Sequence, residues 1–111
     1  MERRFPESDW KGFRQVQALA LDRFCQRVLT EVNELAADTG RSSHERYLAV
    51  YKLLQHRHNE LAAAFDDSRR STAFVQLARI RAAGLLSDKE FASFSAETRA
   101  LVQVFLDMWR E

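Results

Sequence analysis

The sequence predicts an all-α protein, an up-down helical bundle of four to five helices with a long first helix. Apolar residues recur every three or four positions along most of the chain, which is the period of an amphipathic helix. The 111 residues include only three glycines and one proline, too few for the turns of a β fold. Serine followed three residues later by glutamate, the capping box of a helix start, occurs twice where an apolar run begins.

The first helix is predicted over residues 9–38, with Ser8 or Asp9 as its N-terminal cap and Gly40 as a left-handed stop. Thirty helical positions would extend about 45 Å, longer than a compact domain of this size is wide. We therefore expect either a bent helix or an elongated molecule, or a dimer that covers the excess helix. Its main apolar positions are Phe13, Val16, Ala20, Phe24, Val28, Val32 and Leu35, flanked by Leu21, Cys25 and Leu29.

A second helix is predicted to begin at Ser42, which forms a capping box with Glu45, and to last to about Ala64. Its apolar positions follow a heptad-like spacing of four and three, so we expect this stripe to pack antiparallel on the first helix. The stripe consists of Tyr47, Tyr51, Leu54, His58, Leu61 and Phe65.

Three shorter helices are predicted after the second. The third starts between Asp66 and Ser71 and ends at Gly84, the fourth starts at the capping box of Ser87, and Ser95 caps the last. Residues 84–91 resemble a phrase found in many unrelated small bacterial helical domains, which implies a helix stop and a capped helix. We expect one helical domain over residues 1–111, with a flexible segment at 1–7.

Charge and cysteine content bear on partners and compartment. Seventeen basic and 16 acidic residues give a net charge of +1, so no overall field selects nucleic acid or an anionic membrane. The single cysteine, Cys25, excludes an internal disulfide and fits a reducing, cytoplasmic setting. No apolar run approaches the roughly 20 residues that span a bilayer, so no membrane partner is expected.

The sequence offers no catalytic pattern. It contains no dinucleotide-binding or phosphate-binding glycine loop, no zinc-protease helix and no nucleophile elbow. None of the three histidines follows a glutamate by three positions, which excludes the helical di-iron arrangement. We therefore expect a protein that is not an enzyme and holds neither a cofactor nor a metal.

His58 is the residue that most resembles a site, because it interrupts the apolar stripe of the second helix. The favoured interpretation is a core histidine satisfied by one hydrogen bond. The alternative is a small-ligand pocket between the first two helices, lined by Cys25, Tyr47, Tyr51 and His58.

Four arginines around the third helix form the best nucleic-acid signal: Arg69, Arg70, Arg79 and Arg81. A groove-reading helix would need a helix-turn-helix partner, and the pattern around Gly84 does not provide one. A solvated face paired with nearby acids is the favoured interpretation, and a nucleic-acid-associated regulator remains an alternative.

Large aromatic side chains mark candidate interfaces, since tyrosine and tryptophan are enriched there as well as at core edges. The candidate interface residues are Trp10, Phe13, Tyr47, Tyr51 and Trp109. Together with the overlong first helix, they favour a non-enzymatic protein-protein interaction module. Its first expected partner is a second copy of itself, followed by a protein that the sequence does not name.

Overall fold

The computed structural model describes residues 5–66 and 69–110. These residues form an all-α structure with a long first helix, as predicted, and contain no strand. The elements are α1 (Glu7–Ala36), α2 (Ser43–Phe65), a short 3-10 turn (Arg70–Thr72), α3 (Ala73–Ala82), α4 (Asp88–Ala92) and α5 (Ala96–Trp109). The molecule is elongated, with extents of 57 × 25 × 24 Å.

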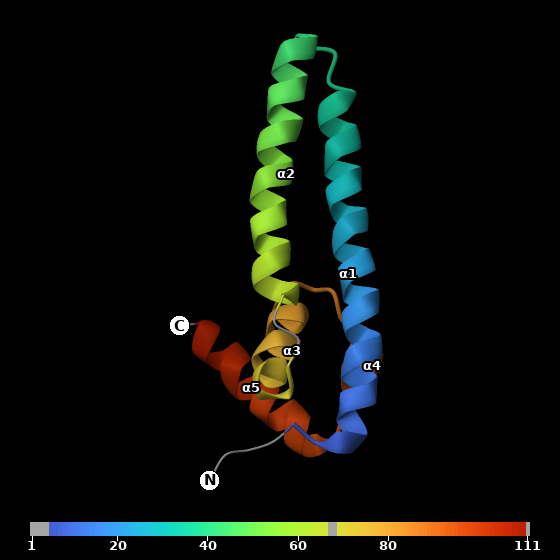
Figure 1. The fold of residues 1–111 in the computed structure, drawn as a ribbon, viewed down its shortest axis with the longest axis vertical. Coiled ribbons are helices and arrows are strands. Elements are labelled where there is room, and N and C mark those ends of the chain that lie inside the picture. The colour runs from blue at the N-terminus through green and yellow to red at the C-terminus, as the bar shows by residue number, and fades with distance from the viewer. Residues whose placement is uncertain (1–4, 67–68, 111) are drawn as a thin grey trace.

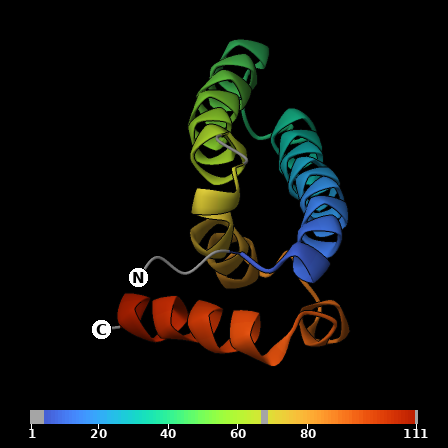
Figure 2. The same ribbon diagram turned by 60° about the horizontal axis from the view of Figure 1, so that its bottom comes forward.

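The arrangement of the helices divides the molecule into two parts. α1 and α2 form a long antiparallel hairpin, and α3, α4 and α5 gather around the start of α1, with α5 lying across the end of the molecule (Figures 1 and 2). We call residues 24–61 the arm and the other described residues the base. The largest fully buried side chains among the described residues all belong to the base: Phe13, Leu77, Ile80, Thr98 and Val102.

Three of the predicted helix starts are confirmed. The Ser42 and Ser87 hydroxyls each accept a hydrogen bond from the backbone amide of the glutamate three residues later, and the backbone amide of each serine donates to that glutamate's carboxylate. Ser95 caps α5 through the Thr98 amide. Gly84 ends the third helix with a φ of 72°, the left-handed conformation that glycine adopts without strain.

The predicted cap of α1 is wrong. The helix begins after Pro6 with no side-chain cap, and Asp9 instead reaches the start of α5. Its carboxylate accepts hydrogen bonds from the Ser95 amide at 3.1 Å, the Ser95 hydroxyl at 2.6 Å and the Thr98 hydroxyl at 2.6 Å. Asp9 therefore joins two helix starts, because a carboxylate is stabilised by donors and by the positive end of a helix dipole.

Two further expectations about chain segments need correction, and some positions that they concern are not described. α1 ends at Ala36, where Ala37 has right-handed geometry, so Gly40 is not a left-handed stop and its amide bonds Asp38 instead. Phe5 lies within the segment expected to be flexible, yet it is 3% exposed because it packs on Phe13 and Phe74. Residues 1–4, 67, 68 and 111 lie outside the described residues, and with them most of the 1–7 segment and two of the positions given for the start of the third helix.

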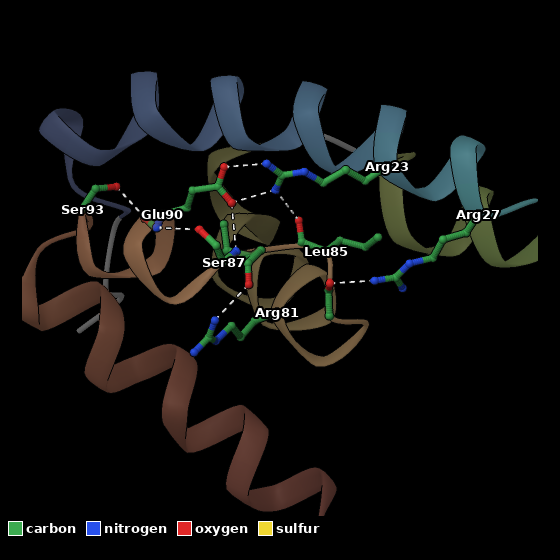
Figure 3. Close-up of polar contacts among 9 residues, drawn as sticks. Arg23, Arg27, Arg81, Leu85, Ser87, Glu90 and Ser93 are labelled. Carbon is green, nitrogen blue, oxygen red and sulfur yellow. Dashed lines mark hydrogen bonds and ion pairs between the residues drawn. The ribbon is translucent and has the colours of Figure 1, made fainter.

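Two arginines of α1 form hydrogen bonds with the segment from Ala83 to Glu90 and so hold this part of the base against one side of the helix (Figure 3). Arg23 donates to both carboxylate oxygens of Glu90, at 2.7 and 2.8 Å, and to the Leu85 carbonyl at 2.9 Å. Arg27 donates to the carbonyls of Ala83 and Gly84, both at 2.7 Å. The bonds from Arg23, followed by those from the Ser87 backbone, lower the pKa of Glu90 to about 2.

Candidate interaction site on the arm

The arm is a pair of helices without a third layer. Among residues 24–61, all of which the structure describes, only Val28 is buried. Amphipathic helices are stable when their apolar stripe is covered by another element, and two helices alone cover only part of each stripe. The arm therefore leaves much of its apolar surface in solvent.

A charged cluster supplements the contact between the arm helices. Arg57 on α2 donates to Glu31 on α1, at 3.2 and 3.3 Å, and to Glu60 one turn along, at 2.9 and 3.0 Å. Hydrogen bonds to Glu60 and then to Glu31 raise the pKa of Arg57. Near the tip, Arg46 donates to the Ala36 carbonyl at 2.7 Å. These bonds fix the two helices side by side.

One face of the arm is hollowed into an apolar groove of about 570 Å³ between α1 and α2. α1 contributes Phe24, Cys25, Val28 and Leu29, and α2 contributes Tyr51, Leu54, Gln55, Arg57, His58 and Leu61. Leu29 is 56% exposed, Tyr51 is 53% exposed and Leu54 is 45% exposed. The groove is thus wide open to solvent.

The predicted ligand-pocket residues are only partly brought together. Cys25, Tyr51 and His58 line the groove, whereas Tyr47 lies nearer the tip, beside a separate hollow formed with Ala36, Ser43, Arg46 and Val50. Cys25 is a free thiol of intermediate burial. The groove does not enclose a ligand, since half of the Tyr51 surface remains in solvent.

The expectation of a core histidine at position 58 is wrong. His58 is exposed, and so are the other members of the predicted stripe nearer the tip, Tyr47, Tyr51 and Leu54. The less exposed positions of α2 lie about one residue away from that stripe, at Arg46, Val50, Leu53 and Arg57. One position turns a helix by about 100°, which moves the predicted stripe from the contact with α1 to the groove and its edge.

The candidate interface residues lie in three different places. Phe13 is fully buried, so it belongs to the core and is not an interface residue. Trp10 is half-buried, stacks on Phe13 and has the Arg70 guanidinium 5.1 Å from its ring centre. Tyr47 and Tyr51 are exposed on the arm, and Trp109 is 44% exposed near the C-terminal end of α5.

The four arginines of the nucleic-acid hypothesis make contacts within the chain. Arg70 pairs with Glu7, Arg81 pairs with Asp88 and lies over the Phe91 ring, and Arg79 donates to the Ala63 carbonyl. Arg69 also has an interaction within the chain. These contacts hold the base together and reduce the charge available to a phosphate backbone.

Sequence reasoning did not select Leu29, Leu54 or Val28 as site residues. The signal was present in the first helix, where Leu21, Cys25 and Leu29 follow one another at four-residue intervals beside the main apolar stripe. A second stripe of this kind widens the apolar face beyond what one partner helix can cover.

The described residues contain no group of three or more metal-ligating side chains, and none of their helices is long and apolar enough to cross a bilayer. No protein family, curated protein or solved structure matches the chain.

Proposed function

We propose that this chain is a non-enzymatic protein-protein interaction module and that the apolar face of the arm is its binding surface. The observation that carries the proposal is the near absence of burial in the arm, where Val28 is the one buried residue among positions 24–61. An exposed contiguous apolar surface on a water-soluble helix pair is typical of a binding site.

The groove favours an α-helical partner. Apolar side chains line both walls, and they repeat along α2 at the intervals of four and three that meet the matching stripe of another helix. A small ligand is less favoured, because a pocket normally buries most of its ligand and this groove leaves its own walls half exposed. The free Cys25 thiol in the groove supports a reducing compartment, for which we propose the cytoplasm.

Site-specific photo-crosslinking in cells tests this function with a matched pair of positions. Leu29 and Leu19 are both exposed leucines of α1, at 56% and 48%, but Leu19 belongs to the base, about 15 Å along the helix from Leu29, and does not line the groove. A photoreactive residue at position 29 should form one discrete adduct with another protein chain. The same residue at position 19 should not.

The adduct must also depend on the rest of the groove. Adding Leu54→Glu to the position 29 reporter should abolish the adduct, because a carboxylate on the facing wall makes apolar docking unfavourable. Equal crosslinking from positions 19 and 29, or no adduct from either, would count against an interaction function of the arm.

A further inference from the structure

We infer that the partner of the arm is a second copy of this chain, so that two arms pack groove to groove as a four-helix bundle with both bases outside it. This inference rests on the proposed function and names its partner. Four features of the structure support it: an unobstructed groove face, a groove and ridge on the same chain, the balance of charge, and the size of the face.

The first feature is that the base leaves the groove face free. Arg23 and Arg27 hold the segment around Gly84 and α4 on one side of α1 (Figure 3). Cys25 and Leu29 are each two positions from Arg27, about 200° around the helix, and point to the other side. A second arm can therefore lie along the groove without meeting α4.

The second feature is that the chain carries both parts of a complementary contact. The groove lies between α1 and α2, and Tyr51 and Leu54 stand out along its α2 edge with 53% and 45% of their surface exposed. Tyr47, 67% exposed, continues the same row towards the tip, beyond the groove. Helices pack when a ridge of one enters the groove of another. A two-fold axis through the groove places each ridge in the partner's groove, which is the self-complementary contact of a symmetric dimer.

The third feature is that the face needs no charged partner. Among the described residues, Arg57 is the only Lys, Arg, Asp or Glu side chain that lines the groove, and it already bonds Glu31 and Glu60. An oppositely charged partner is therefore not required. The whole chain has a net charge of only +1, so two copies meet with little repulsion.

The fourth feature is size. From Ser43 to Leu61, α2 extends about 28 Å, and two adjacent helices are about 20 Å wide, so the face has an outline of roughly 550 Å². That outline lies below the roughly 800 Å² per partner of a standard interface, near the size of weak and transient contacts. A dimer through this face is therefore expected to form at micromolar rather than nanomolar concentrations.

Sedimentation equilibrium of the purified full chain, from about 1 to about 100 μM, tests the dimer. We expect a mass of twice 12.9 kDa at the upper concentrations. Leu54→Glu and Leu29→Glu should each weaken the dimer by about 100-fold or more, because symmetry places two carboxylates in one apolar interface. Leu19→Glu, outside the groove and about 15 Å from Leu29 along α1, should change the dissociation constant by no more than about twofold.

Both groove variants should keep the helical circular dichroism of the wild-type chain, because their side chains are already exposed in one copy. A monomer at every concentration would overturn the inference, and so would a dimer that Leu19→Glu breaks and both groove variants leave intact. If the chain is a monomer yet position 29 still crosslinks to a different protein, the proposed function stands and only the second copy is refuted. If the chain is a monomer and position 29 forms no adduct, both the dimer and the proposed function are refuted.

Discussion

At the scale of residues, the buried carboxylate of Asp9 shows how a few side chains organise the base. Asp9 is 6% exposed and accepts three hydrogen bonds from Ser95 and Thr98, of which Thr98 is fully buried. Sequence reasoning identified Ser95 as a cap but assigned Asp9 to its own helix. The partner lies 86 residues away, and local spacing carries no information about such a contact.

Replacing Asp9 by alanine should lower the free energy of unfolding by about 3 kcal/mol, because it leaves buried donors of Ser95 and Thr98 without acceptors. Urea denaturation at one fixed protein concentration measures the change. Asp22→Ala is the matched control, since Asp22 is an exposed aspartate of the same helix and its loss should cost less than about 0.5 kcal/mol. Equal losses in the two variants would contradict the role given to Asp9.

Glu90 makes the free energy of unfolding depend on pH in the acid range. Its pKa falls from 4.5 to about 2 in the folded chain, chiefly through the bonds from Arg23. The ionised carboxylate therefore stabilises the fold above pH 4.5, and this contribution is lost as the pH falls from 4.5 towards 2. We expect Glu90→Gln to be less stable than wild type at pH 7 and to lose less stability on acidification through that interval.

Urea denaturation at a series of pH values measures the effect of Glu90, with Glu34→Gln as the control at an exposed glutamate on the far part of α1. The control should follow the wild-type acid profile. A Glu90→Gln profile that also parallels the wild type would show that the pair with Arg23 does not contribute to acid stability.

For the helices, the sequence predicted most of the boundaries correctly. It did not predict which face of α2 contacts α1. Ser42, Ser87 and Gly84 are local signals, since each satisfies backbone groups within its own helix end. The apolar stripe of α2 matched a heptad, but the structure buries positions one residue away from it and leaves Tyr51 and His58 in the groove. Two adjacent apolar stripes of α2 are each suited to pack on α1. The sequence of one chain does not show which stripe contacts α1 and which stays exposed.

Replacing Gly84, which ends α3, and Gly12, which lies inside α1, by alanine should change stability in opposite directions. Gly84 has a φ of 72° and an added Cβ would lie 3.4 Å from Arg27, so Gly84→Ala should lower stability by about 1 to 2 kcal/mol. Gly12 is inside α1, where a Cβ would meet only Phe94 at 3.8 Å, so Gly12→Ala should raise stability by roughly 0.5 to 1 kcal/mol. Thermal melts compare the two variants, and shifts of the same sign would contradict this account.

At the scale of the whole molecule, the elongated shape is the feature that sequence reasoning anticipated and the structure explains. α1 was predicted to be too long for a compact domain, and the extents of 57 × 25 × 24 Å confirm an elongated chain. The base buries a core of its own, while the arm projects with one buried residue. In the self-association that we propose, a second arm covers the apolar surface that α1 and α2 leave exposed.

Cys25 offers the most direct measurement of that proposal, because it is the single cysteine of the chain and it lies in the groove. The rate at which a maleimide labels its thiol reports whether the groove is covered. If a second copy covers it, labelling should slow at least about tenfold between low and high micromolar protein, in step with dimer formation, and Leu54→Glu should abolish the slowing. A labelling rate that does not change with protein concentration would contradict the account.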